Sequence, residues 1–133
     1  MTSPRVLLVD DEDRFRTRLA QMLVAEGLEV HQAAGGPEAL EELAQQPYDV
    51  VLLDLRLPGM DGLAVMAAIK ERHPEVEVIV LSGHASLDAA MDIIRLGGYD
   101  YLLKPCPTEE LLLKIDAAFE KKQDRQRRQK RPG

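Results

Sequence analysis

The chain has 133 residues, of which 45% are hydrophobic and 30% charged, and this length favours one domain with a buried core. No apolar run reaches the ~18 residues that a membrane span needs, and residues 1–4 lack the features of a secretory signal, so we expect a cytoplasmic protein that does not contact a membrane. The single cysteine, Cys106, excludes an internal disulfide bond.

The formal net charge of −6 is unevenly distributed along the chain. Residues 120–133 carry +5 and the remainder carries −11. A basic arm of this kind can contact nucleic acid, but no aromatic or base-reading pattern accompanies it. We therefore expect a basic C-terminal tail or linker over residues 120–133, with solvated charges and no direct nucleic-acid binding.

Apolar residues follow two different periods that alternate along the chain. Short, branched, nearly continuous apolar runs are typical of parallel strands covered on both faces, and they predict strands at 6–9, 50–53, 78–81 and 101–103. Residues 28–33 add a weaker strand. Between these runs the spacing becomes helical. The helical stripes are Phe15, Leu19, Met22 and Leu23; Leu40, Leu43 and Ala44; Leu63, Met66 and Ala67; Leu87, Ala90, Met91 and Ile94; and Leu111, Ile115 and Phe119.

Several residues mark the expected helix ends. Pro37 suits the first turn of the second helix, and Pro74 requires the third helix to end before it. Ser86 is an expected N-cap of the fourth helix, which stops at the glycine pair 97–98, and Thr108 is the expected cap of the fifth.

Five alternating strand and helix units predict an α/β fold: one parallel sheet with right-handed crossovers and helices on both faces. We expect the flavodoxin-like (βα)5 strand order 2-1-3-4-5 in a single domain over residues 4–119. The topological switch point then lies between the first and third strands. This order places Asp10 and Asp11 beside Asp54.

Four of the predicted strands end at residues that can handle a phosphoryl group: Asp10–Asp11, Asp54, Ser82 and Lys104. In an open parallel sheet the site lies outside the carboxyl ends of the strands. We therefore expect three carboxylates, one hydroxyl and one ammonium along a single edge.

Three carboxylates held together repel one another by about 4 kcal/mol per pair at 4 Å and an effective dielectric constant near 20, so a cation is expected among them. Oxygen ligands without a histidine or cysteine cluster favour Mg²⁺ or Mn²⁺ over zinc. Asp10 and Asp11 are the expected metal-holding pair. Asp54 stands alone at its strand end and is the expected nucleophile toward phosphorus, with Lys104 and Ser82 stabilising the oxygens of the transferred group.

Four ordered motifs resemble the receiver domain of two-component response regulators, and the resemblance covers residues 4–119. The motifs are LVDD (8–11), LDLRLPGMDG (53–62), LSGHA (81–85) and YDYLLKP (99–105). The resemblance implies that Asp54 is the phosphoacceptor, receiving its phosphoryl group from the phosphohistidine of a sensor histidine kinase or phosphotransfer protein. It also implies that Asp10, Asp11 and the backbone carbonyl of Arg56 hold Mg²⁺ together with Asp54.

The same resemblance assigns roles in switching. Ser82 matches the switch hydroxyl, Lys104 the conserved lysine of the family, and Tyr101 the aromatic residue that turns inward when Ser82 moves toward the phosphate. The Lys104–Pro105 peptide bond would be cis. The fourth helix, fifth strand and fifth helix would carry the change to an output domain or partner protein, and the same face is a candidate surface for a homodimer.

Arg56 and His84 each lie two positions beyond a site residue and are candidates for tuning the lifetime of the phosphate. The competing interpretation, in which both side chains point into solvent, carries equal weight.

Two other functions compete with the receiver hypothesis. One is a phosphorylation-independent interaction module with a vestigial acidic site, against which the presence of all five key residue types argues. The other is an aspartyl phosphatase of the haloacid dehalogenase class, which needs a second aspartate where Arg56 stands. Because the chain shows no glycine-rich phosphate loop or Ser-His-Asp arrangement, we expect catalysis only of its own phosphorylation and dephosphorylation.

The sequence leaves the kinase, the stimulus and the output undetermined. The sequences of the second and third motifs resemble those of receivers attached to transcriptional activators, which is an analogy at the level of the family. The chain is therefore either a stand-alone regulator or a receiver cut from a larger protein.

Overall fold

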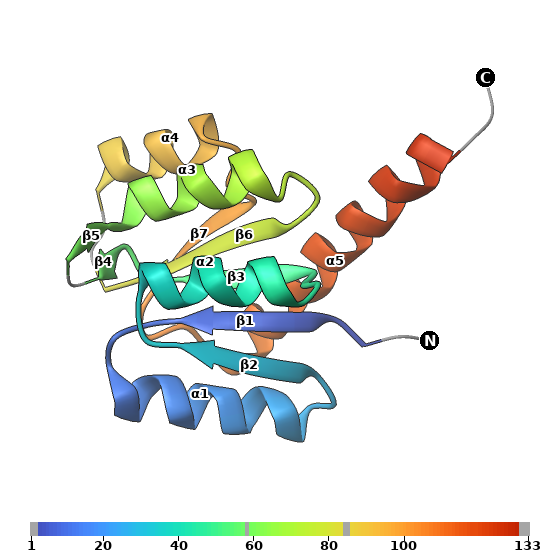
Figure 1. The fold of residues 1–133 in the computed structure, drawn as a ribbon. Coiled ribbons are helices and arrows are strands. Elements are labelled where there is room, and N and C mark those ends of the chain that lie inside the picture. Colours follow the sequence, from blue (N-terminus) through green and yellow to red (C-terminus); the bar gives the residue numbers. More distant parts are fainter. Residues whose placement is uncertain (1–2, 58, 84–85, 131–133) are drawn as a thin grey trace.

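The computed structural model describes residues 3–57, 59–83 and 86–130, in which helices cover both faces of a parallel sheet (Figure 1). The sheet consists of β1 (Arg5–Val9), β2 (Glu29–Ala33), β3 (Val50–Leu53), β6 (Glu77–Ser82) and β7 (Asp100–Leu103). The helices are α1 (Asp13–Ala25), α2 (Gly36–Gln45), α3 (Gly62–Arg72), α4 (Leu87–Arg95) and α5 (Thr108–Lys130). Within these residues, no helix combines the length and the apolar character needed to cross a membrane.

The strand order β2-β1-β3-β6-β7 confirms the predicted flavodoxin-like order 2-1-3-4-5. All neighbouring strands of this sheet run parallel. Val9 pairs with Leu53 in the register of β1 and β3, so the residues that follow them, Asp10 and Asp54, leave the sheet side by side. The fold thus brings the expected acidic residues to one edge.

Two apolar layers hold the sheet between its helices. One contains Leu19 and Leu23 of α1 with Ile115 of α5, packed against one face of the sheet. The other contains residues of α2, α3 and α4 on the opposite face. Successive residues of a strand point to opposite faces, so Leu7 and Leu8 enter different layers, which explains why the strands read as unbroken apolar runs.

Most local signals for helix ends agree with the structure, but Thr108, the expected cap of α5, is its first helical residue, and the Pro107 carbonyl accepts the first helical bond. Pro37 lies in the first turn of α2, and the Ser86 hydroxyl accepts the Ala89 backbone N–H at 3.2 Å. The N-cap of α3 was not predicted: there the Asp61 side chain accepts the Leu63 N–H at 3.1 Å.

A short antiparallel hairpin was also missed. It consists of β4 (Arg56–Leu57) and β5 (Met60–Asp61), which follow Asp54 directly. Strands of two residues are too short to show a period in the sequence. The hairpin nevertheless matters because it shapes the loop beside the site.

The apolar stripe predicted on α4 faces outward rather than into the core. Leu87, Met91 and Ile94 are 78%, 52% and 58% exposed, whereas Ile93 is fully buried. Periodicity identified the helix correctly but not the side that packs on the sheet.

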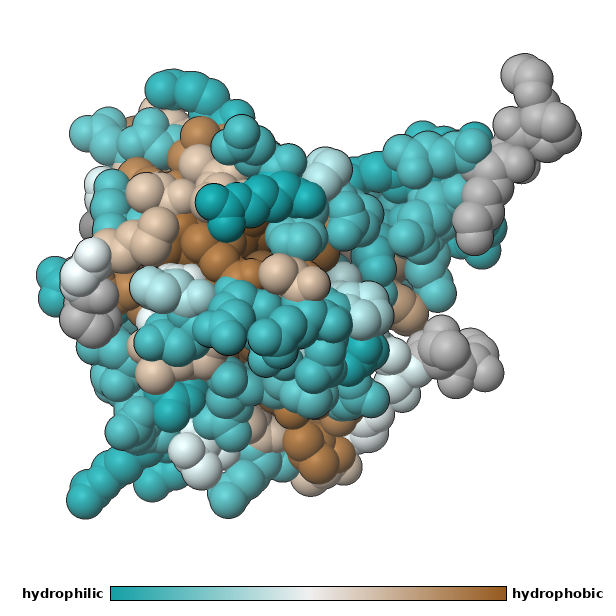
Figure 2. Space-filling model, viewed as in Figure 1, coloured by the Kyte–Doolittle hydropathy of each residue, from teal (hydrophilic) through white to brown (hydrophobic). Residues whose placement is uncertain are grey.

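Helix α5 continues to Lys130, through most of the segment expected to form a tail from residue 120. The extension projects beyond the sheet in Figure 1, and Figure 2 shows hydrophilic residues over most of it. Lys122 Nζ lies 2.5 Å from Asp49 Oδ1, and Arg125 Nη2 lies 2.8 Å from Glu77 Oε1. Glu77 has 0% exposure. These basic side chains are therefore paired with the body, at the edge of the sheet opposite the strand ends that carry Asp10 and Asp54.

The pairing of Arg125 with buried Glu77 should be measurable in stability. Arg125→Gln leaves Glu77 facing the more distant ammonium of Lys121 at 3.8 Å, and should lower the free energy of unfolding by about 2 kcal/mol. The matched control Arg127→Gln, which removes an exposed pair with Asp124 on the same helix, should cost less than about 0.5 kcal/mol. Equal losses in urea denaturation would contradict this account.

The loop after Asp54 packs directly on the start of α3. A Cβ placed on Gly62 would lie well under 3.0 Å from the backbone of Leu55, which cannot rotate away. Gly62→Ala should therefore lower the free energy of unfolding by about 3 kcal/mol.

Gly27→Ala serves as the control, because Gly27 has φ 92° and no atom within 4 Å of the added Cβ. It should cost about 1 kcal/mol from backbone strain alone. Denaturation curves showing the same loss for both variants would rule out the Leu55 contact as the cause.

Candidate functional site

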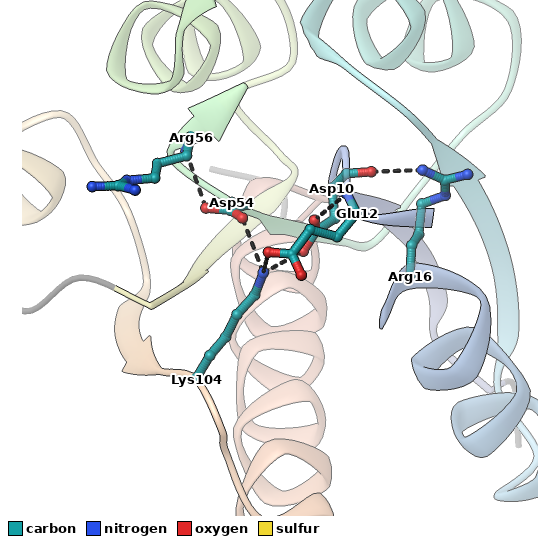
Figure 3. Close-up of polar contacts among 6 residues, drawn as sticks. All are labelled: Asp10, Glu12, Arg16, Asp54, Arg56 and Lys104. Carbon is teal, nitrogen blue, oxygen red and sulfur yellow. Dashed lines mark hydrogen bonds and ion pairs between the residues drawn. The ribbon is translucent and has the colours of Figure 1, made fainter. Parts of the chain in front are cut away.

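The core of the site is a lysine held between two buried carboxylates (Figure 3). Lys104 Nζ donates to Asp10 Oδ2 at 2.6 Å and to Asp54 Oδ2 at 2.9 Å. Asp10 and Asp54 are only 1% and 5% exposed. They follow β1 and β3, and Lys104 follows β7, so three strand ends meet as the sequence predicted.

Backbone donors fix the orientation of both carboxylates. The Glu12 N–H donates to Asp10 Oδ1 at 2.9 Å, and the Arg56 N–H donates to Asp54 Oδ1 at 3.0 Å. In each case the donor lies two residues after the aspartate, an arrangement that aspartate favours after a strand. One oxygen of each carboxylate therefore faces the backbone and the other faces Lys104.

Glu12 supplies the third carboxylate of the site. Its Oε1 lies 3.7 Å from Lys104 Nζ, and one oxygen each of Asp10, Glu12 and Asp54 lies within 4.8 Å of the others. The sequence predicted Asp11 as the metal-holding partner of Asp10 and did not single out Glu12. Asp11 is exposed and is not part of this three-carboxylate group. Glu12 is exposed as well, so exposure does not separate the two residues, and the metal-binding role of Asp11 stays a prediction.

The electrostatics of the site are dominated by negative charge. At an effective dielectric constant near 20, two carboxylates about 4.8 Å apart repel by about 3–4 kcal/mol. Burial raises the pKa of Asp10, and the hydrogen bonds from Lys104 and from the Glu12 backbone only partly oppose it. Burial alone would lower the pKa of Lys104, but its bonds to Asp10 and Asp54 outweigh that effect and raise it.

The donor set suits a hard divalent cation. Three carboxylates and one ammonium leave two negative charges uncompensated, which matches the charge of Mg²⁺ or Mn²⁺. All of the ligand atoms are oxygens, the type that these ions prefer.

The remaining predicted residues lie around this core. Ser82, 1% exposed, ends β6, and its carbonyl accepts the Lys104 N–H at 2.9 Å. The Lys104–Pro105 peptide bond is cis, as the resemblance implied. The Tyr101 hydroxyl is buried and has no hydrogen-bond partner among the described residues.

The two candidates for tuning the phosphate lifetime are less defined. The Arg56 side chain is exposed and points away from the carboxylates in Figure 3. His84 lies outside the described residues.

Comparison with known proteins places these features in a family. The family model of the response regulator receiver domain matches residues 6–116. The DNA-binding transcriptional regulator NtrC of Escherichia coli is 40% identical over 121 residues, which cover 91% of this chain and 26% of that protein. A putative NtrX-like response regulator of Rickettsia bellii is 40% identical over 117 residues, covering 86% and 24%. The chain thus spans about a quarter of the length of these relatives.

Solved structures agree with this match. A CheY-like receiver domain protein from Methanospirillum hungatei superimposes with a TM-score of 0.89 at 28% identity, covering 93% of this chain and 99% of that one. The receiver domain of NtrX from Brucella abortus gives 0.81 at 38% identity, covering 86% and 98%.

The raised pKa of Asp10 predicts an unusual effect on stability. A carboxyl group whose pKa is raised by folding stabilises the folded state fully below its unfolded pKa, near 3.8. This stabilisation is lost as the pH rises through the folded pKa. At neutral pH the charge on Asp10 therefore opposes folding. Asp10→Asn should therefore raise the free energy of unfolding in metal-free buffer at pH 7. The variant should also lose most of the stabilisation by Mg²⁺, which in the wild type reaches about 2.7 kcal/mol at 100 times the dissociation constant.

Asp13→Asn is the matched control for this measurement. Asp13 lies three residues after Asp10, begins α1 and pairs with Arg16, outside the three-carboxylate group. It should retain the stabilisation by Mg²⁺. Thermal denaturation with and without Mg²⁺ checks both variants, and a metal-free Asp10→Asn protein that is less stable than wild type would contradict the electrostatic account.

Proposed function

This chain belongs to the family of response regulator receiver domains, and from that membership we propose that Asp54 accepts a phosphoryl group from the phosphohistidine of a sensor kinase or phosphotransfer protein. One observation carries the proposal: Asp54 is buried against Lys104 at an edge that holds two further carboxylates. Carboxylates crowded in this way lower the stability of the fold, and groups of this kind are typical of sites where a charged group is transferred.

The transfer is a displacement at phosphorus. An oxygen of Asp54 forms the new P–O bond while the P–N bond to the donor histidine breaks, and the electron pair stays on the imidazole nitrogen. Lys104 places its ammonium beside the attacking carboxylate, where it stabilises negative charge on the phosphoryl oxygens. The Ser82 hydroxyl is the proposed partner of one of those oxygens.

A bound Mg²⁺ or Mn²⁺ would neutralise charge on the transferring group. The proposed ligands are the carboxylates of Asp10, Asp54 and Glu12, together with Asp11 and the carbonyl of Arg56 as the resemblance implies. The density of carboxylate oxygens around Asp54 supports this assignment.

The proposed output is a population shift between two arrangements of the loops around Ser82 and Lys104. Phosphorylation adds nearly a second negative charge and three acceptor oxygens at Asp54, which these side chains bind in only one arrangement. Tyr101, on the strand next to Ser82, is the proposed reporter of that movement.

The face formed by α4, β7 and α5 is the proposed surface that transmits the change. Exposed apolar side chains gather on these elements, and they are Leu87, Met91, Ile94, Leu103 and Leu113. An output domain, a partner protein or a second copy of the chain would cover them. The relatives named as transcriptional regulators favour an output domain in a longer protein.

The activity is limited to the domain's own phosphorylation and dephosphorylation. Arg56 and His84 remain proposed regulators of the phosphate lifetime. The alternative of a vestigial acidic site is not favoured, since Asp54 and Lys104 keep both their burial and their contact.

Incubation with acetyl phosphate and Mg²⁺ tests the proposal. The wild-type protein should gain the mass of one phosphoryl group, and Asp54→Asn should gain none because its side chain lacks the nucleophilic carboxylate. Asp61→Asn, which changes an exposed helix cap in the same segment, is the control and should be modified like the wild type. Mass spectrometry of intact protein gives the result, and an unmodified wild type would support the interaction-module alternative.

A further inference from the structure

The ring of Phe15 lies against the ammonium of Lys104. The distance from Lys104 Nζ to the ring centroid is 4.2 Å, within the range of a cation–π contact. Phe15 belongs to the first turn of α1 and packs, partly buried, against the core layer between α1 and α5. The ring therefore reaches Lys104 from a helix that supplies none of the hydrogen-bond partners of the Lys104 ammonium.

The start of α1 is fixed to the site by Arg16, the residue next to Phe15. Arg16 Nη1 donates to the Asp10 carbonyl oxygen at 2.7 Å, and Nη2 lies 2.9 Å from Asp13 Oδ1. Arg16 thus connects the end of β1 to the first turn of α1. This connection sets the position of the Phe15 ring relative to the Asp10 carboxylate and Lys104.

An aromatic ring attracts the Lys104 ammonium without accepting one of its hydrogen bonds, whereas another carboxylate would accept one. The ammonium has three N–H donors, and Asp10 and Asp54 accept two of them. The ring attracts the cation but accepts no strong hydrogen bond. Lys104 therefore keeps donor capacity for a phosphoryl oxygen while it is held in place.

We propose that Phe15 is a positioning residue for phosphoryl transfer: its ring holds the Lys104 ammonium at the carboxylates without occupying the donor that the phosphoryl group needs. The inference rests on the proposed function of Asp54 and adds a residue that acts through Lys104. Because Lys104 is only 13% exposed, water screens the contact little, and the expected effect on rate is about three- to thirtyfold.

The Phe15 ring also packs against apolar neighbours, and the test must separate this packing from the cation–π contact with Lys104. It borders a hollow of about 120 Å³ between α1 and the segment after Lys104. Met22 lines the same hollow about two turns further along the same face of α1, and makes a suitable packing control.

Three variants measured with acetyl phosphate and saturating Mg²⁺ divide these roles. Phe15→Leu keeps an apolar side chain but removes the ring, and should lower the phosphorylation rate constant about three- to thirtyfold. Phe15→Tyr keeps the ring and should stay within about twofold of the wild type. Met22→Leu should also stay within twofold.

Two rate outcomes would overturn the inference. One is a Phe15→Leu variant as fast as Met22→Leu, and the other is a Phe15→Tyr variant as slow as Phe15→Leu. Should Phe15→Leu fail to fold, a phenylalanine fluorinated on its ring at position 15 replaces it, because the fluorinated ring keeps nearly the same shape with a weakened negative face. Slower phosphorylation of that protein supports the inference, and an unchanged rate overturns it.

A double-mutant cycle with Lys104→Met tests the contact independently of phosphorylation. The change in unfolding equilibrium constant caused by Phe15→Leu should be at least about threefold smaller when Lys104 is already absent. Additive effects would overturn the inference. A wild-type protein that takes up no phosphate would instead contradict the proposed function, while the cycle would still report on the contact.

Discussion

The structure depends on the ammonium group of Lys104, which carboxylates from distant parts of the chain bind. Lys104 binds Asp10, 94 residues away, and Asp54, 50 residues away, and each bond requires the strand order and register to be correct. In a doubly wound sheet the strands end together at one edge, so register and site are the same constraint. A slip of one residue between β1 and β3 would turn one of the two aspartates to the other face of the sheet and remove it from the ammonium.

Charged side chains are paired differently at the two ends of the strands. At the amino ends of the strands, Asp49 and Glu77 are matched by Lys122 and Arg125 from the α5 extension, and those pairs attach the helix to the body. At the carboxyl ends, three carboxylates share one lysine, and the pKa of Asp10 is raised. Burial of the apolar layers on both faces of the sheet offsets the repulsion among these carboxylates. The proposed phosphorylation site and the ion pairs that attach α5 therefore lie at opposite ends of the strands.

Sequence reasoning succeeded where a pattern is set by burial and failed where it is set by a turn or a distant partner. The strands were found because both faces of the sheet are covered, and the order of strands placed Asp10, Asp54 and Lys104 together. Glu12 was missed because its carboxylate reaches Lys104 from the turn after β1, where no periodic pattern marks which side chain contacts a residue 92 positions away. The ordered extension of α5 was missed because Glu77 lies 48 residues before Arg125.

Under the proposed function, charge explains why this site can act as a switch. The three carboxylates and Lys104 together carry two negative charges, and phosphorylation of Asp54 raises this to nearly three. A divalent cation offsets two of them, so the excess that remains must be met by hydrogen-bond donors. Lys104 is already in contact with Asp54 and is held by Asp10 and Phe15, so it has little distance to move. We therefore expect the rearrangement to fall on Ser82, which ends the strand that precedes α4 in the chain. A fixed lysine is what turns a local change of charge into movement on the opposite side of the site.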